Sequence, residues 1–137
     1  MYTINEVFEQ ALSDGYTATL NGNGYESRSV YGVKIIRDID TREVIILNTM
    51  KGGEHYIPLS HEEVNIFLEK GWRIGVYVVT LSNYRLKLEQ VENSIRDEMN
   101  GKVSDKVIQE LKDKRTSLLN SYTELNNKLN GQQKISL

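Results

Sequence analysis

The C-terminal part of the chain carries a heptad repeat of apolar residues, and this repeat restricts the possible folds more than any other feature. In residues 104–129, SDKVIQELKDKRTSLLNSYTELNNKL, mostly apolar positions recur at alternating spacings of four and three residues. The spacing predicts a long helix with one packing seam. The positions on the seam are Ser104, Ile108, Leu111, Arg115, Leu118, Tyr122, Leu125 and Leu129.

A second series with the same spacing precedes the first. Its positions are Leu81, Tyr84, Leu88, Val91 and Ile95, and it stops at the break NGKVS, residues 100–104. The two series predict an antiparallel helical hairpin or coiled-coil pair. We expect the first helix to begin after Ser82, and the second to run from Ser104 to about Asn130 and Gly131.

Helices with these bounds differ in length. At 1.5 Å per residue, about 18 and about 25 residues span roughly 27 and 37 Å, so the second helix should overhang the first by about 10 Å. We expect its last turns to pass back over the sheet or to reach another chain. Residues 131–137, GQQKISL, are expected to be a flexible tail.

The first 81 residues have a different pattern. Thr3 followed by Glu6, and Ser60 followed by Glu63, form capping boxes that open short helices. The first helix should end near Asp14 and Gly15, and the second should run through Leu68 and close at Gly71. Strand-like segments rich in β-branched and aromatic residues are residues 16–20, 29–38, 42–49, the short edge segment 55–59, and WRIGVYVVT at 72–80.

Turn signals separate these strands, at NGNG in residues 21–24 and at DIDT in residues 38–41. The order of helix, strands, helix and strand predicts an α+β unit around a small, mainly antiparallel sheet. The expected organisation is a sheet domain at 1–81, a helical hairpin at 82–130 that packs on it and mediates oligomerisation, and a tail at 131–137.

Composition excludes several classes of protein. The 137 residues include no cysteine and carry a formal net charge of −2, so we expect no disulfide framework and no binding to nucleic acid polymers. No apolar run approaches the roughly 20 residues that span a bilayer. The acidic N-terminus lacks the layout of a signal peptide. We therefore expect a cytoplasmic protein without a membrane anchor.

Few features of the sequence indicate catalysis, and the carboxylates are scattered on helix faces. The two histidines, His55 and His61, flank a proline and a helix cap, with no second ligand at metal spacing. No nucleophile elbow and no lysine-bearing phosphate loop is present. The sequence predicts a binding protein rather than an enzyme, with no metal and no cofactor.

Arg115 is the first candidate for ligand binding, because a charge on a packing seam needs a partner or a hydrated pocket. Level with it across the hairpin lie Leu88 and Glu89. Arg115 could form an ion pair with Glu89 or Glu92 across the seam, or set the register of the two helices as a polar residue. Alternatively, its planar guanidinium could hold a phosphate, assisted by Lys112 one turn earlier. The sequence leaves both roles open.

The second candidate is the corner VVTLSNYR, residues 78–85. The N–H groups of a helix that begins after Ser82 would form an anion site, with Asn83 and Arg85 projecting from its first turn. Three aromatic residues near this corner, Trp72, Tyr77 and Tyr84, could stack a nucleobase, although such residues are more often core or interface.

The stretches VYGVKIIRDIDTREVIILNTMKGG (30–53), FLEKGWRIGVYVVTLSNYRLKLEQVENSIRDEMN (67–100) and LKDKRTSLLNSYTELNNKLN (111–130) resemble the phage Thoeris anti-defence sponges of the first type described. The resemblance covers roughly residues 3 to 130 and rests on overall pattern. It implies a small antiparallel sheet before two long helices, and assembly through the helices into a homodimer or homohexamer.

The resemblance also implies a function. Proteins of that family sequester cyclic ADP-ribose isomers, the signals of the bacterial Thoeris defence, without cleaving them, and some also hold CBASS cyclic oligonucleotides. We expect Arg115 and Lys112 to neutralise the diphosphate, Asn83 and Arg85 to contact the ligand, and Tyr77, Trp72 or Tyr84 to stack the base. The alternative is a protein–protein interaction module, for example a phage inhibitor of a host protein that acts through the helical hairpin.

Overall fold

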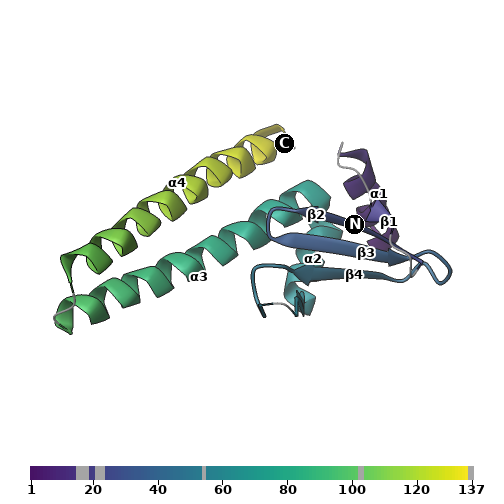
Figure 1. The fold of residues 1–137 in the computed structure, drawn as a ribbon. Helices are drawn as coiled ribbons and strands as arrows, with labels where there is room; N and C mark the ends of the chain where they lie inside the picture. The colour runs from purple at the N-terminus through teal and green to yellow at the C-terminus, as the bar shows by residue number, and fades with distance from the viewer. Residues whose placement is uncertain (15–18, 21–23, 54, 102–103, 136–137) are drawn as a thin grey trace. The chain divides into compact units, whose positions relative to one another are not determined.

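The computed structural model describes residues 1–14, 19–20, 24–53, 55–101 and 104–135 (Figure 1). The chain divides into two units, Met1–Thr80 and Leu81–Leu137, which we call the sheet unit and the hairpin unit. The sheet unit combines an antiparallel sheet with two helices and the first turns of a third. The hairpin unit holds the rest of the third helix and a fourth. The α+β architecture predicted from the sequence is confirmed.

Within the described residues the sheet has five strands in sequence order, each antiparallel to the next. In the register, Val30 lies opposite Val33, Arg28 opposite Ile35, and Ile35 opposite Ile46. Because side chains alternate along a strand, Arg28 and Val30 share one face of the sheet. The strands are β1 (Thr19–Leu20), β2 (Tyr25–Val30), β3 (Val33–Asp38), β4 (Val44–Asn48) and β5 (Ile57–Pro58).

The segment predicted as one strand at 29–38 is a hairpin instead. Strands β2 and β3 are joined by a turn at Tyr31 and Gly32, and Tyr31 has a φ of 52°. A tyrosine at positive φ gives no turn signal in the sequence, and β-branched residues on both sides concealed the break. The predicted strand residues 16–18 and turn residues 21–23 lie outside the described part of the chain.

Both predicted capping boxes are confirmed. In α1 (Ile4–Ser13) the Thr3 hydroxyl accepts the Glu6 N–H at 3.1 Å, and the Glu6 carboxylate accepts the Thr3 N–H at 2.9 Å. In α2 (His61–Lys70) Ser60 and Glu63 make the same pair of contacts. The second helix ends at Gly71, as predicted, where φ is 93°.

The strand predicted at 72–80 is wrong, because these residues form the first turns of α3 (Trp72–Asn100). The buried positions in this stretch include Trp72, Gly75, Val76, Val79 and Thr80. Their spacing of i, i+3, i+4, i+7 and i+8 is that of one helix face. The β-branched side chains that favour a strand are here buried on a helix, so tertiary packing outweighs local propensity.

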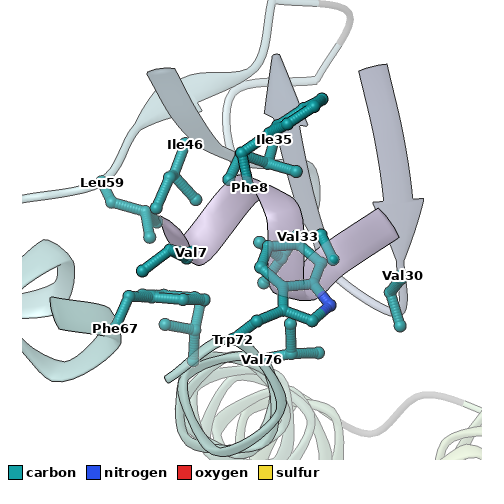
Figure 2. Close-up of a cluster of buried hydrophobic side chains, with 12 residues drawn as sticks. Val7, Phe8, Val30, Val33, Ile35, Ile46, Leu59, Phe67, Trp72 and Val76 are labelled. Carbon is teal, nitrogen blue, oxygen red and sulfur yellow. The ribbon is translucent and has the colours of Figure 1, made fainter. Parts of the chain in front are cut away.

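The hydrophobic core of the sheet unit lies on one face of the sheet (Figure 2). Helices α1, α2 and the start of α3 cover the inward side chains of β2, β3 and β4. Twelve buried residues make up this core: Val7, Phe8, Ala11, Val30, Val33, Ile35, Ile46, Leu59, Phe67, Trp72, Val76 and Val79.

In the hairpin unit the remainder of α3 packs with α4 (Asp105–Ile135), and the predicted heptad series agree with the burial pattern. Val91 and Ile95 on α3 are each 5 % exposed, and Leu125 on α4 is 4 % exposed. All other apolar seam positions are at least half-buried. Among the described residues, no helix is long and apolar enough to cross a membrane.

Two expectations about the lengths of the helices are wrong. Helices α3 and α4 have 29 and 31 residues, so the predicted overhang of about 10 Å does not follow from their lengths. The segment expected to be a tail from residue 131 is helical through Ile135. Gly131 was taken as a helix stop, yet it lies within α4 without a positive φ.

Candidate functional site

The seven residues predicted to contact a ligand are divided between the two units. Trp72 and Tyr77 belong to the sheet unit, where both line the same small cavity. The other five belong to the hairpin unit: Asn83, Tyr84, Arg85, Lys112 and Arg115.

Arg115 forms an ion pair within the hairpin. Its Nη1 atom donates to Oε1 of Glu92 at 2.9 Å, and the two side chains are 37 % and 47 % exposed. The sequence left two roles open for Arg115, an ion pair within the hairpin and a contact to a phosphate. The structure shows the ion pair. A phosphate was expected here because an unpaired charge on the seam would need a partner. Glu92 is that partner, so a phosphate is no longer needed. Lys112, one turn earlier, is half-buried.

The helix N-terminus predicted after Ser82 does not exist, because α3 begins ten residues earlier at Trp72. The N–H groups that follow Ser82 lie within a helix and donate to carbonyls four residues back, so they form no anion site. Asn83 is buried, with 4 % of its surface exposed. The guanidinium of Arg85 lies 5.9 Å from the centroid of the Tyr122 ring.

Two adjacent hollows lie in the sheet unit at the start of α3. The larger, which we call the acidic hollow, is open and has a volume of about 450 Å³. Its lining residues come from the N-terminus, α1 and α3: Tyr2, Glu6, Glu9, Gln10, Ser13, Asp14, Trp72 and Arg73. The smaller, which we call the aromatic hollow, has a volume of about 140 Å³. It is lined by Asp14, Val30, Tyr31, Trp72, Arg73, Val76 and Tyr77.

An ion pair stands where the two hollows adjoin. The guanidinium of Arg73 donates through both Nε and Nη2 to the two carboxylate oxygens of Asp14, with 3.4 Å between Nε and Oδ2. The Arg73 side chain is 48 % exposed, whereas that of Asp14 is 18 % exposed. The contact joins the end of α1 to the first turn of α3 and presents donors and acceptors to both hollows.

The first residue of α3 is held in place by α1. The Trp72 N–H donates to the side-chain oxygen of Gln10 at 2.8 Å, which caps the helix from another element. Gly71, which precedes it, has positive φ, and a Cβ atom there would lie 2.9 Å from the same oxygen. Glycine at 71 therefore allows Gln10 of α1 to come close to the start of α3. The hydrogen bond from Trp72 to Gln10 then holds Trp72 in the wall of both hollows.

Two tyrosines form one side of the aromatic hollow. The rings of Tyr31 and Tyr77 have centroids 6.2 Å apart and an interplanar angle of 55°. Tyr31 is half exposed, and its backbone lies in the left-handed region, which is uncommon for a residue with a bulky side chain. Strained backbone of this kind gathers at binding and catalytic sites, so the turn that carries Tyr31 supports a functional role for this hollow.

The indole N–H of Trp72 lies buried without a hydrogen-bond partner among the described residues. The residue is 1 % exposed. In Figure 2 the indole nitrogen lies on the side of the ring toward Val30 and Val76, which line the aromatic hollow. Buried donors are nearly always paired in folded proteins, so an acceptor at this position would be favourable.

Sequence reasoning missed Arg73 and Tyr31. Arg73 and Tyr77 are four residues apart, which places them on one helix face, but the strand assigned to 72–80 put neighbouring positions on opposite faces. A helical reading would have found Arg73. Tyr31 was placed within a strand, and its position depends on a turn that the sequence did not reveal.

The two hollows offer aromatic and charged side chains to a ligand. Aromatic rings, one guanidinium and several carboxylates can stack a flat ring and exchange hydrogen bonds with polar groups. Among the described residues, no three His, Cys, Asp or Glu side chains are grouped so that they could hold a metal ion.

Comparisons with known protein families, with curated proteins and with solved structures return no match for this chain.

Proposed function

We propose that the chain is a non-catalytic binding protein that sequesters a cyclic ADP-ribose isomer, and that the aromatic hollow holds the base of this ligand. The ligand class comes from the resemblance to the Thoeris sponges. The location is supported by one observation, the grouping of Tyr31, Tyr77 and Arg73 around one cavity. Base–aromatic stacking is worth about 1–3 kcal/mol per base, and it does not depend on which base is stacked.

The acidic hollow is suited to the ribose hydroxyls. The carboxylates of Glu6, Glu9 and Asp14 line it, and carboxylate oxygens accept hydrogen bonds from hydroxyl groups. Glu6 and Glu9 already accept from Thr3 and Arg37, but each carboxylate has further acceptor sites. The same negative charges repel a phosphate, so the diphosphate must lie outside this hollow, toward a cationic group.

A sequestering protein benefits from a preformed site, because a rigid pocket lowers the ordering cost of binding. The hydrogen bond from Trp72 to Gln10 and the ion pair from Arg73 to Asp14 hold the walls of the hollows in place before any ligand arrives. The proposal needs no group that transfers a proton or attacks the ligand.

The central experiment is retention of an intact ligand. The protein is mixed with a cyclic ADP-ribose isomer and passed through a sizing column, after which the protein fraction is heated and the supernatant is analysed by mass spectrometry. Release of unchanged ligand supports sequestration. Release of an altered compound indicates an enzyme, and absence of ligand from the protein fraction contradicts the proposal. Cyclic di- and trinucleotides are tested in the same way, since CBASS signals are the second expected ligand class.

Two substitutions test whether the ligand binds at the aromatic hollow. Tyr77→Ala removes one wall of the aromatic hollow and should weaken ligand binding by about tenfold or more, since one stacking contact is worth about 1–3 kcal/mol. Arg73→Ala should also weaken binding, because it removes the guanidinium at the boundary of the hollows. Calorimetric titration measures both effects, with circular dichroism to confirm folding.

Two controls accompany these variants. Tyr25→Ala alters a tyrosine outside both hollows, and its affinity should equal that of the wild type. Arg115→Ala breaks the ion pair to Glu92 and should also leave affinity unchanged. If Arg115→Ala abolishes binding while Tyr77→Ala does not, the ligand lies at the hairpin and the proposed location is wrong.

A specific observation favours a second candidate function, a protein–protein interaction module. The hairpin unit exposes large apolar side chains, with Leu86 40 %, Met99 60 % and Leu119 52 % exposed. Exposed apolar side chains on helices can contribute to docking on a partner. Failure of every cyclic nucleotide to co-elute with the protein would favour this candidate over sequestration.

A further inference from the structure

Two arginines are buried on the core face of the sheet, and each is 6 % exposed. Arg37, on β3, is fully compensated. Its guanidinium donates to Glu9 at 2.7 Å and to Glu26 at 3.0 and 3.3 Å, and it lies 4.2 Å from the centroid of the Phe8 ring. Two carboxylates and one aromatic face thus meet a single buried charge, as expected for a structural arginine.

Arg28, on the adjacent strand β2, lacks such compensation. Its Nε and Nη1 atoms are closed to solvent and have no hydrogen-bond partner within the described part of the chain. Arginine keeps its positive charge in proteins, and burying that charge without a partner destabilises the folded state. Glu26 lies two residues earlier on the same face, but its Oε2 atom accepts from Arg37, and no hydrogen bond joins Glu26 to Nε or Nη1 of Arg28.

Arg28 does not itself line the aromatic hollow, but it lies two residues from Val30, which does. It shares one face of β2 with Val30, two residues further on, and Val30 lines that hollow. The indole N–H of Trp72, directed to the same side in Figure 2, is a second buried donor without a described partner. Within the described residues, two nitrogens of Arg28 and the indole nitrogen of Trp72 are therefore unpaired, whereas the carboxylate of Asp14, which lines the same hollow, is bonded to Arg73.

We infer that Arg28 is an anion-binding residue that receives a phosphate-class oxyanion, with the Trp72 indole N–H as a second donor. The inference deepens the proposed function, because the oxyanion is then the diphosphate of the bound nucleotide. A guanidinium holds phosphate oxygens through charge-assisted hydrogen bonds from its N–H groups, and such bonds would supply acceptors for the orphaned nitrogens of Arg28. Because those nitrogens are closed to water in the unliganded chain, the side chains covering them must move aside when the anion binds.

The test is thermal unfolding with inorganic diphosphate, against sodium chloride at equal ionic strength. For the wild type, diphosphate should raise Tm by several degrees, since a ligand that binds the folded state stabilises it. Arg28→Met should have a higher Tm than the wild type without diphosphate, because replacing an uncompensated buried charge by an apolar side chain relieves its cost. This variant should show no increase in Tm on adding diphosphate.

Arg37→Met is the matched control, since Arg37 has the same exposure on the neighbouring strand. It should lower Tm by leaving Glu9 and Glu26 unpaired, yet retain the increase caused by diphosphate. Arg28→Lys, which keeps the charge but loses the planar fork, provides a second variant if Arg28→Met does not fold. Its increase in Tm should be smaller than that of the wild type.

Two outcomes overturn the inference. One is a wild-type Tm that does not respond to diphosphate, and the other is an equal response in the Arg28 variants. The column experiment separates this inference from the proposed function. If Arg28→Met retains a cyclic ADP-ribose isomer as well as the wild type does, the inference fails and the function stands. If diphosphate binding depends on Arg28 but no cyclic nucleotide is retained, the inference stands and the function fails.

Discussion

Gly75 shows how the absence of a side chain allows close packing at the start of α3. A Cβ atom at this position would overlap the ring of Phe67, which is fully buried. Glycine is disfavoured in a helix interior by about 1 kcal/mol relative to alanine, so its presence there needs a reason. The reason is the close approach of α2, which brings Phe67 against the α3 backbone and next to Trp72, with ring centroids 5.7 Å apart.

We therefore expect Gly75→Ala to destabilise the protein. Overpacking a core costs about 1–3 kcal/mol, which exceeds the gain in helix propensity. Urea unfolding followed by circular dichroism measures the free energy of unfolding. Gly131→Ala in α4 is the control, since a Cβ atom there meets no atom within 4 Å. That substitution should stabilise by up to about 1 kcal/mol. Equal effects of the two substitutions would refute the packing argument.

At the scale of the element, the capping box of α1 links stability to pH. The N–H and hydroxyl groups of Thr3 hydrogen-bond to the Glu6 carboxylate and hold its pKa below the ordinary value of 4.5. A carboxyl with a lowered pKa in the folded state binds protons more readily when unfolded. Its stabilising contribution is fully present above pH 4.5 and is lost as the pH falls through the lowered value.

Glu6→Gln should therefore reduce the loss of stability on acidification. Glutamine can still close the capping box but does not titrate. The urea midpoint, measured at a series of pH values around and below 4.5, should fall less steeply for the variant than for the wild type. Glu62→Gln removes one negative charge from the first turn of α2 outside its capping box and serves as the control. The same acid dependence in wild type and Glu6→Gln would contradict the linkage.

Helix α3 illustrates where element prediction succeeded and where it failed. From Leu81 onward, alternating spacings of three and four identified the helix, because no strand buries residues at that period. Before Leu81, the run from Trp72 to Thr80 is rich in residues that suit either a strand or a buried helix. Its helical state results from packing against Phe67 and the sheet, which local sequence does not encode.

At the scale of the whole molecule, the hairpin unit leaves three large apolar side chains exposed among the described residues. Leu86, Met99 and Leu119 are each at least 40 % exposed, and contact with another copy would remove this apolar area from water. Most soluble oligomers are closed assemblies of identical chains. We expect a homodimer or homohexamer that forms through the helices.

Leu119→Glu tests this expectation. The substitution keeps a good helix former but places a charge at the most exposed leucine of α4, so the assembly should dissociate without loss of helix. Sedimentation equilibrium gives the mass of each species. Asn120→Glu adds the same charge to the neighbouring exposed position and should leave the mass unchanged. A wild type with the mass of one chain at micromolar concentration would show the expectation to be wrong.

The sequence by itself determined the elements whose signals are local. Capping at Thr3 and Ser60, the stop at Gly71 and the heptad seams each depend on residues close together in the chain, so each was predictable. Tertiary structure decided the rest. Arg115 acquired its partner Glu92 from the opposite helix, Tyr31 took a strained turn, and residues 72–80 became helix. Both hollows and the buried Arg28 depend on contacts between elements distant in sequence, and such contacts exist only once the chain has folded.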